Sequence, residues 1–397
     1  MERFSDAERR RRLAHRHGLL RPHGSVPAAT AAMAALHATE AATVHLALWA
    51  RVEGVTVADV DRSLYDERSV VKQLAMRRTL FGFPRELLPA AWGSASARVA
   101  RQQRAQLAKN ILAADLVASP EAAEDWIETV ACAVLAVLAD GTARTTREIR
   151  ALVPVLDGRI SVGGGPERKW GGEFPVGAWV MGTLGAEGRV LRAANAGHWR
   201  LNKPAWTTAE HWLGEVPDPL PEAEGYAALV ARWLETFGPG TEADIVWWLG
   251  ATKTVVRRAL ADVGAEPVAL EAGGTGWVLP GDAGPEEEVA PWAALLPTLD
   301  PTVMGWKERS FYLDPADTPY LFDSNGNAGN TAWWDGRIVG CWVQDDAARV
   351  HLVLREDVPA AGRRALAHEA ERLTAWLDGV RITNVYASPQ MRGARLP

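Results

Sequence analysis

The sequence contains very few cysteines. Only Cys132 and Cys341 occur among its 397 residues, and they lie far apart in apolar surroundings. Two isolated cysteines cannot build the disulfide framework of a small secreted domain or the clustered thiolates of a structural metal site. We therefore predict two buried free thiols in a reducing compartment.

The chain also lacks a long apolar run and an excess of positive charge. No segment reaches the roughly 20 apolar residues of a membrane span. The charged N-terminus, "MERFSDAERRRRLAHRHGLL", has no apolar core of a secretory signal. We expect a cytoplasmic protein with no membrane partner. The formal net charge of −6 excludes a uniformly basic coat for nucleic acid, but local basic patches can still steer a polyanion.

The common catalytic signatures are absent as well. The sequence has no Walker A loop, HExxH, CxxC or GxSxG motif. The stretch "SVGGGPER" (161–168) has three consecutive glycines, but no GK[ST] follows and no helix opens directly on it. This pattern favours a flexible loop or hairpin over a phosphate cradle. The sequence indicates no metal and no cofactor.

Tryptophan, in contrast, is abundant. Eighteen tryptophans occur in the chain. Core packing explains such a number most simply, and a surface on which some indoles stack on bases or sugars is the alternative.

The N-terminal part reads as mostly helical. Residues 1–24 resemble a basic amphipathic helix followed by a turn, and a solvated face is the usual explanation of its arginine run. Further helices are expected from about residue 40, from Thr56, where Asp59 completes a variant capping box, and over about 94–116. The stretch before the last of these, up to Pro84, is typical of strands or a wing.

The middle of the chain shows the same order of elements twice. Residues 121–215 predict three helices and a β-hairpin, with a Thr145-x-x-Glu148 capping box opening the second helix. Residues 216–284 repeat this order: a helix, a helix that opens on Thr241 and stops at Gly250, a further helix, and a hairpin about a Gly-Gly turn. Helices followed by a hairpin are typical of a winged helix.

The last part has a different character. After the linker-like "PGDAGPEEEVAP", the runs "GRIVGCWVQ", "ARVHLVLRED" and "VRITNVYASP" predict strands, with one helix between the last two. We therefore predict an α+β protein of tandem winged-helix units with a C-terminal mainly β domain. The predicted domains are 1–120 (helical or winged-helix, with the candidate active site), 121–215 and 216–284 (winged helices) and 285–397 (β-rich).

The stretch "LHATEAATVHLALWARV" contains the candidate site. Thr39 followed by Glu40 is a good helix N-cap with a carboxylate in the first turn. Residues 37–39 would then be extended, so that His37 and Thr39 share one face beside the helix N-terminus. A capping Thr39 and a packed His37 are the structural alternative. His45 is expected to be a buried or partly buried residue of the helix.

Basic side chains of the predicted wings and recognition helices are the candidates for contacts with duplex DNA, because a winged helix places a helix in a groove and a wing on the backbone. Scaffolding without nucleic acid is the alternative for such modules. The DNA-binding candidates are Arg77, Arg78, Arg159, Arg168, Lys169, Arg200, Lys203, Lys253, Arg257 and Arg258.

Taken together, "LHATEAATVHLALWARV", "AMRRTLFGFP", the repeated winged-helix order and "GWKERSFYL…WWDGRIVGCWVQ" resemble the winged-helix DNA-binding proteins of the AlkZ/YcaQ type. The resemblance covers nearly the whole chain. It implies three tandem winged helices on a concave DNA-binding surface, and a glycosylase that removes bulky alkylated purines or unhooks interstrand crosslinks. Some members protect antibiotic producers from their own alkylating products.

The resemblance also points to the catalytic residues. The family carries Gln-x-Gln or Gln-x-Asp where this chain has His37 and Thr39. His37 would orient or deprotonate a water, Thr39 would hydrogen-bond it, and Glu40 would add negative charge near the sugar. The predicted function is a monomeric DNA glycosylase acting on duplex DNA with alkylated or adducted purines. The alternatives are a non-catalytic winged-helix DNA-binding protein and a scaffold.

Overall fold

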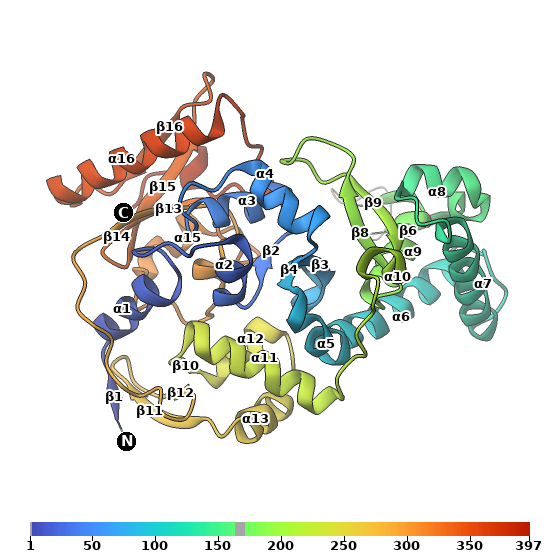
Figure 1. Ribbon diagram of the computed structural model, residues 1–397, viewed down its shortest axis with the longest axis horizontal. Helices are drawn as coiled ribbons and strands as arrows, with labels where there is room; N and C mark the ends of the chain where they lie inside the picture. Colours follow the sequence, from blue (N-terminus) through green and yellow to red (C-terminus); the bar gives the residue numbers. More distant parts are fainter. Residues whose placement is uncertain (1, 163–170) are drawn as a thin grey trace. The chain divides into compact units, whose positions relative to one another are not determined.

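The computed structural model describes residues 2–162 and 171–397 (Figure 1). They form two compact units. The first unit contains Met1–Val70, Phe81–Leu87 and Tyr226–Pro397, and the second contains Val71–Leu80 and Leu88–Gly225. Both units combine helices with sheets, so the predicted α+β class is correct. The predicted division into four domains stays a prediction.

The second unit is built on a helical core with a small sheet (Figure 1). Its helices are α5 (Leu88–Ala91), α6 (Ala97–Ala113), α7 (Pro120–Leu138), α8 (Thr146–Leu152), α9 (Gly177–Ala186) and α10 (Ala209–Leu213). Strands β5 (Arg144–Thr145), β9 (Pro204–Thr208) and β8 (Val190–Asn195) form an antiparallel sheet in that order. Apolar side chains of α6, α7, α8 and α9 share one core with Trp206 of β9. The predicted order of three helices and a hairpin over 121–215 is therefore present.

A separate pair of strands precedes α9. Strands β6 (Arg159–Val162) and β7 (Gly172–Pro175) pair antiparallel. The glycine-rich stretch lies outside the described residues from 163 on, so its interpretation as a loop or hairpin stays a prediction. Arg168 and Lys169 lie outside the described residues.

The same element order recurs in the first unit, where α11 (Glu222–Phe237, in this unit from Tyr226) is followed by two shorter helices and a hairpin. The short helices are α12 (Glu242–Leu249) and α13 (Lys253–Asp262), and the hairpin is β11 (Glu266–Leu270) with β12 (Thr275–Val278). Strands β1 (Arg3–Phe4) and β10 (Gly240–Thr241) extend this sheet to the order β1-β11-β12-β10.

Three helix starts predicted from capping boxes are confirmed. Thr56 caps α4 (Val57–Asp61), Thr145 caps α8 and Thr241 caps α12, each with the reciprocal bonds from the residue three positions on. Gly250 ends α12 in the left-handed conformation at φ 62°, as a C-terminal glycine does without a Cβ penalty. These signals were reliable because all partners lie within four residues.

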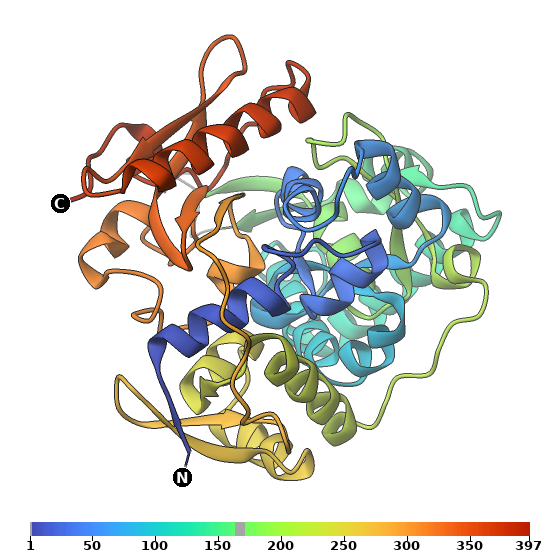
Figure 2. The same ribbon diagram turned by 60° about the vertical axis from the view of Figure 1, so that its left-hand side comes forward.

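The C-terminal part contains a four-stranded antiparallel sheet. Its order is β13 (Ala293–Leu296), β14 (Thr331–Trp334), β15 (Arg337–Gln344) and β16 (Val350–Leu354). Helix α16 (Ala360–Leu377) packs against this sheet (Figure 2). In the sequence, the short helices α14 (Pro301–Met304) and α15 (Thr318–Leu321) lie between β13 and β14.

The predicted strand "VRITNVYASP" (380–389) is wrong. Residues 380–389 contain no strand. Their backbone groups bond to side chains instead: Ile382 donates to Gln344, and Val385 and Tyr386 donate to Glu40. A β-like composition does not make a strand when side chains from elsewhere satisfy the backbone.

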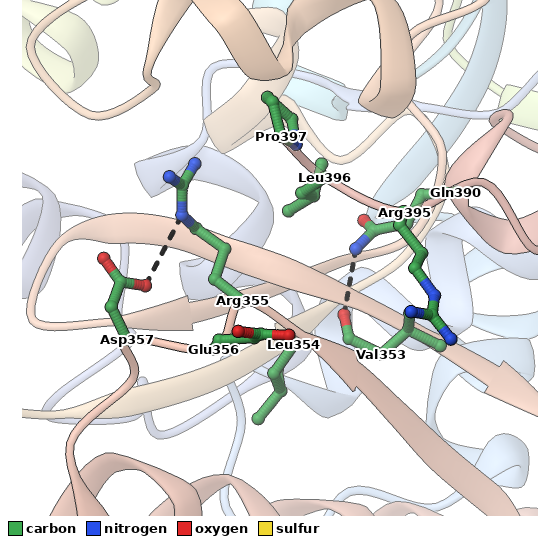
Figure 3. A pocket seen from close by; sticks show the side chains of 9 residues that line it. All are labelled: Val353, Leu354, Arg355, Glu356, Asp357, Gln390, Arg395, Leu396 and Pro397. Atoms are coloured by element: carbon green, nitrogen blue, oxygen red, sulfur yellow. Dashed lines mark hydrogen bonds and ion pairs between the residues drawn. The ribbon is translucent and has the colours of Figure 1, made fainter.

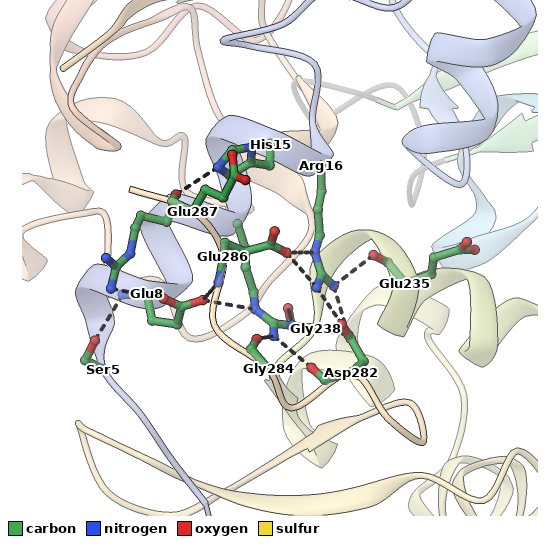
Figure 4. Close-up of polar contacts among 12 residues, drawn as sticks. Ser5, Glu8, His15, Arg16, Glu235, Gly238, Asp282, Gly284, Glu286 and Glu287 are labelled. Carbon is green, nitrogen blue, oxygen red and sulfur yellow. Dashed lines mark hydrogen bonds and ion pairs between the residues drawn. The ribbon is translucent and has the colours of Figure 1, made fainter. Parts of the chain in front are cut away.

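The arginines of α1 (Asp6–Arg16) do not form a solvated face, contrary to the prediction. Arg9 and Arg12 are buried. Arg12 and Arg16 bind the carboxylate of Asp282, and Arg16 also binds Glu286, both in the segment that follows β12 (Figure 4). The acidic linker predicted from composition is thus the partner of the basic helix.

The rest of the first unit carries the candidate site. It includes α2 (Val26–Ala32), β2 (Leu36–His37), α3 (Ala41–Trp49), α4 and the first residue of β3 (Val70–Leu74). The chain returns to this unit within β4 (Leu80–Pro84). The helix expected over 94–116 is α6, preceded by a π-helical turn at Trp92–Ser96.

Most of the tryptophans pack in the core. Ten of the seventeen in the described part of the chain are buried, and the others are partly buried. Core packing therefore explains the tryptophan content better than a stacking surface does.

The two cysteines differ. Both are free, and Cys341 is buried as predicted, but Cys132 is exposed. Cys132 lies outside the apolar stripe of α7, which consists of Ile127, Val130, Ala131, Val134 and Leu138. Across residues 2–162 and 171–397, no helix has the length and hydropathy needed to cross a membrane.

Candidate active site

His37 is fixed by a short strand. Strand β2 pairs antiparallel with β4, placing Leu36 opposite Gly82 and His37 opposite Phe81. The His37 ring lies 4.4 Å from the Phe81 ring, between centroids, and His37 is only 3% exposed. The predicted extended geometry is confirmed for His37, and the aromatic partner was not predicted.

Thr39 does not cap the following helix, contrary to the prediction. Glu40 occupies the N-cap position, at φ −89° and ψ 127°, and makes no side-chain capping bond. The Oγ1 atom of Thr39 is buried and has no hydrogen-bond partner among the described residues. A buried hydroxyl without a partner costs about 1–3 kcal/mol, so such a group is usually satisfied by water or a ligand.

The Glu40 carboxylate binds the C-terminal segment. Its Oε1 atom accepts hydrogen bonds from the backbone N–H groups of Val385, at 2.6 Å, and Tyr386, at 3.0 Å. Burial raises the pKa of the Glu40 carboxyl, and the two N–H groups partly oppose this rise because they stabilise the charged form. Burial and the nearby Glu40 carboxylate also raise the pKa of Tyr386.

Helix α3 provides a rigid support for these residues. All nine of its residues are buried. Thr43 donates to the carbonyl of Thr298 at 2.9 Å, and His45 contacts Asp61 at 3.0 Å, so His45 is a buried helix residue as predicted. The site residues therefore lie where a short strand leads into a helix with no exposed face.

The described basic candidates lie on different elements of the two units. In the first unit, Lys253, Arg257 and Arg258 are all exposed on α13. Arg257 binds Glu242 at 2.6 Å, and Arg258 lies 3.6 Å from Asp262. These two guanidinium groups have carboxylate partners within the protein.

In the second unit, the candidates lie on turns and hairpins. Arg77 and Arg78 have left-handed φ angles of 54° and 59° in the turn between β3 and β4, and Arg78 is exposed. Arg159 is exposed on β6, while Arg200 and Lys203 precede β9. Two consecutive non-glycine residues in this conformation are uncommon, and such outliers occur often at functional sites.

A pocket of about 710 Å³ lies elsewhere in the first unit (Figure 3). It is formed by Val353–Asp357, Gln390 and Arg395–Pro397. Its two arginines are accompanied by Glu356 and Asp357, so opposite charges offset each other at its wall. None of the predicted site residues lines this pocket.

Metal chemistry has no apparent ligand set in the described ranges. Within 2–162 and 171–397, no group of three or more His, Cys, Asp or Glu side chains is placed to hold a metal ion. What the site offers is an imidazole, a hydroxyl and a carboxylate on three of four successive residues. This set suits the positioning of water and the stabilisation of positive charge.

Comparisons with known proteins identify the family of the chain. No curated protein matches the sequence. Among solved structures, the chain is similar to the Streptomyces sahachiroi DNA glycosylase AlkZ, with a TM-score of 0.73 and 20% sequence identity over 96% of this chain and 99% of that one. At this identity the likeness shows a common fold. The model of the family "DNA glycosylase AlkZ-like" matches residues 30–376, which is most of the chain and includes His37 and Thr39. The chain therefore belongs to the AlkZ-like DNA glycosylase family.

Proposed function

We propose that this protein hydrolyses the N-glycosidic bond of alkylated or bulky-adducted purines in duplex DNA, in base excision repair or in self-resistance to genotoxins. One observation carries the proposal most strongly. In a chain of this family, the buried Thr39 hydroxyl has no partner among the described residues, and it lies two residues from His37 at the start of a rigid helix. A site with an unsatisfied buried donor and acceptor is suited to hold a water molecule.

The chemistry makes few demands on the protein. A purine alkylated at N3 or N7 is cationic, so the base leaves without a general acid. The protein then needs to hold a water and to stabilise an oxocarbenium-like sugar, as in other glycosidic bond cleavages. In this proposal His37 orients or deprotonates the water, and Thr39 hydrogen-bonds it.

Glu40 has two roles in the proposal. Its ionised carboxylate adds negative charge beside the sugar, which favours a cationic transition state. Its Oε1 atom also holds the backbone of Val385 and Tyr386. The second role makes Glu40 a positioning residue as well as an electrostatic one.

The helix and hairpin units would bind the duplex. We interpret α12, α13 and the hairpin β11–β12 as a winged helix, and α8, α9 and β8–β9 as another, because their order matches that fold. The exposed residues Lys253 and Arg78 would contact phosphates, and the protein would act as a monomer.

A non-catalytic DNA-binding protein is the second candidate. The observation that favours it is the departure of His37 and Thr39 from the Gln-x-Gln or Gln-x-Asp pattern of the related proteins. Binding without hydrolysis would need the same duplex surface but no water-holding pair.

Release of free base from a duplex with one 7-methylguanine tests these proposals. We expect wild-type protein to release the base under single-turnover conditions. His37→Ala should be slower by about 100-fold or more, the usual size of a general-base contribution, and Thr39→Val should also be slower because it keeps the shape but loses the hydroxyl. His368→Ala, which changes an exposed histidine of α16, is the matched control.

The outcomes separate the candidates. Duplex binding by the wild type without base release would exclude the glycosylase and support the binding protein. No salt-dependent binding at all would exclude both and leave a scaffold. Thermal unfolding of each variant shows whether lost activity reflects a lost fold.

A further inference from the structure

The segment between α16 and the last 3-10 turn (Gln390–Arg392) is held in place by side chains. Gln344 donates to the carbonyl of Val380 at 3.0 Å and accepts from Ile382 at 2.9 Å. Further along, Thr298, which is fully buried, donates to the Asn384 side chain at 3.3 Å. These bonds hold the backbone at Val380 and Ile382 and the side chain of Asn384, on one side of Val385.

Glu40 completes the attachment. Its buried carboxylate accepts hydrogen bonds from the N–H groups of both Val385 and Tyr386, although about 345 residues separate them in sequence. Hydrogen bonds from N–H groups to a carboxylate are roughly twice as strong as those between neutral groups. The turn at 385–386 is thus fastened to the residue that directly follows Thr39.

Val385 itself is unusual in its exposure. Its side chain is 70% exposed, more than any other large apolar residue in the part of the chain that the structure describes. A single exposed valine on a surface is ordinary. Here, however, its backbone N–H group donates to Glu40, and Gln344 and Thr298 hold the residues just before it. The exposed apolar side chain therefore extends from a fixed backbone next to the candidate site.

We propose that Val385 is a wedge that enters the base stack of the duplex and replaces the nucleotide that is extruded towards His37 and Thr39. This inference rests on the proposed function and adds a residue to it. Enzymes that act on a base must take it out of the stack, which costs a few kcal/mol for unstacking and unpairing. Proteins that unstack DNA frequently insert apolar side chains between base steps.

The chemistry of Val385 fits this role better than a role in hydrolysis. An aliphatic side chain cannot activate water or stabilise charge, but it can occupy the space between two bases and exclude water from it. A wedge must also be rigid, because a mobile loop would lose conformational entropy on insertion. Glu40, Gln344 and Thr298 provide that rigidity before DNA binds.

The test uses a duplex with one 2′-fluoro-7-methylguanosine, whose fluorine slows hydrolysis, next to one 2-aminopurine. The fluorescence of 2-aminopurine rises when it is unstacked. We expect a several-fold rise with wild-type protein and less than half of that rise with Val385→Ala at saturating protein. Val385→Ile keeps a branched apolar side chain and should give the same fluorescence rise as the wild type. Val216→Ala, a second exposed valine outside the site, is the control that should match the wild type.

Base release from the ordinary 7-methylguanine duplex is measured in parallel. We expect Val385→Ala to slow it about 10-fold or more, with Val216→Ala unchanged. Because Val385 is exposed, neither substitution should alter thermal unfolding, which shows that both variants fold. Equal fluorescence and equal base release for Val385→Ala and wild type would overturn the wedge.

The two proposals fail in different ways. A wild type that raises the fluorescence but releases no base would overturn the glycosylase, while loss of that rise in Val385→Ala would still support the wedge. A wild type that releases base without any rise in fluorescence would overturn the wedge and leave the glycosylase intact.

Discussion

The guanidinium group of Arg51 and the carboxylate of Asp300 form a fully buried ion pair. Two guanidinium nitrogens donate to the two carboxylate oxygens, at 2.9 and 2.7 Å, and neither side chain is exposed. Arg51 also donates to the carbonyl of Ala47, in α3, and to Thr302. The pair therefore links the helix that follows the candidate site to the start of the C-terminal part.

Removing one partner of this pair should be costly. Arg51→Met leaves a buried carboxylate without its counter-charge, and we expect the free energy of unfolding to fall by about 3–5 kcal/mol. Urea unfolding measures the change. Arg62→Met is the matched control, because Arg62 is half exposed in its ion pair with Asp59 and should cost no more than about 1 kcal/mol. Equal losses for the two variants would contradict the prediction.

The role of His37 predicts a difference between two substitutions. His37→Gln keeps a side chain that can hydrogen-bond a water, as in the related Gln-x-Gln motif, whereas His37→Ala does not. We expect the rate of base release to decrease from wild type to His37→Gln, and to be lowest for His37→Ala. If neutral His37 takes a proton from the water, the wild-type rate falls as the imidazole becomes protonated, and the glutamine variant lacks that acid limb. A pH–rate profile with identical limbs for both proteins would contradict proton transfer to His37.

The basic residues of α13 should differ in their contribution to DNA binding. Lys253 is exposed, and the described residues provide no ion-pair partner for it within 4 Å, whereas Arg257 already binds Glu242 at 2.6 Å. Each phosphate contact contributes about 0.9 to the slope of log affinity against log salt. We expect Lys253→Ala to lower that slope by about one contact and Arg257→Ala to lower it less. Fluorescence anisotropy between low and moderate salt measures both slopes, and the reverse order would contradict the argument.

The buried carboxyl of Glu40 predicts a pH dependence of stability. Its pKa in the folded protein is raised above the ordinary value of 4.5 because the group is buried. The folded protein then binds the proton more tightly than the unfolded chain, so this stabilising contribution is complete below about pH 4.5 and is lost as pH rises through the folded pKa.

Glu40→Gln removes this contribution while it keeps an oxygen that can accept from Val385 and Tyr386. We expect the unfolding free energy of the wild type, relative to Glu40→Gln, to decrease as pH rises through that range. Urea titrations at several pH values test the sign, with Glu288→Gln at a 93% exposed carboxylate as the baseline. A constant difference between wild type and Glu40→Gln would show that the folded protein does not raise this pKa.

Features determined by near neighbours could be predicted from the sequence. The capping boxes at Thr56, Thr145 and Thr241, and the stop at Gly250, depend on residues within four positions. The order of helices and hairpins followed from the same local signals. The local pattern at the start of this helix drew attention to His37 and Thr39, and only the family resemblance gave them a catalytic role.

Features that depend on distant partners could not be predicted. Arg12 is buried because residues about 270 positions away accept its hydrogen bonds. The predicted start of α3 was wrong by one residue. The bonds from Glu40 to Val385 and Tyr386 were not predicted, because these partners lie at the other end of the sequence. The segment that contains them has β-forming residues, so composition alone predicted a strand.

The discontinuity of the first unit has a consequence for biosynthesis. Helix α3 leaves the ribosome early, but Thr298, Asp300 and Val385, which complete its surroundings, are translated only after the whole of the second unit. The nine apolar or weakly polar residues of α3 therefore lack these contacts while the second unit can already fold. Transiently exposed apolar surface favours aggregation, so we expect newly made chains to need protection in that interval and the candidate site to form late.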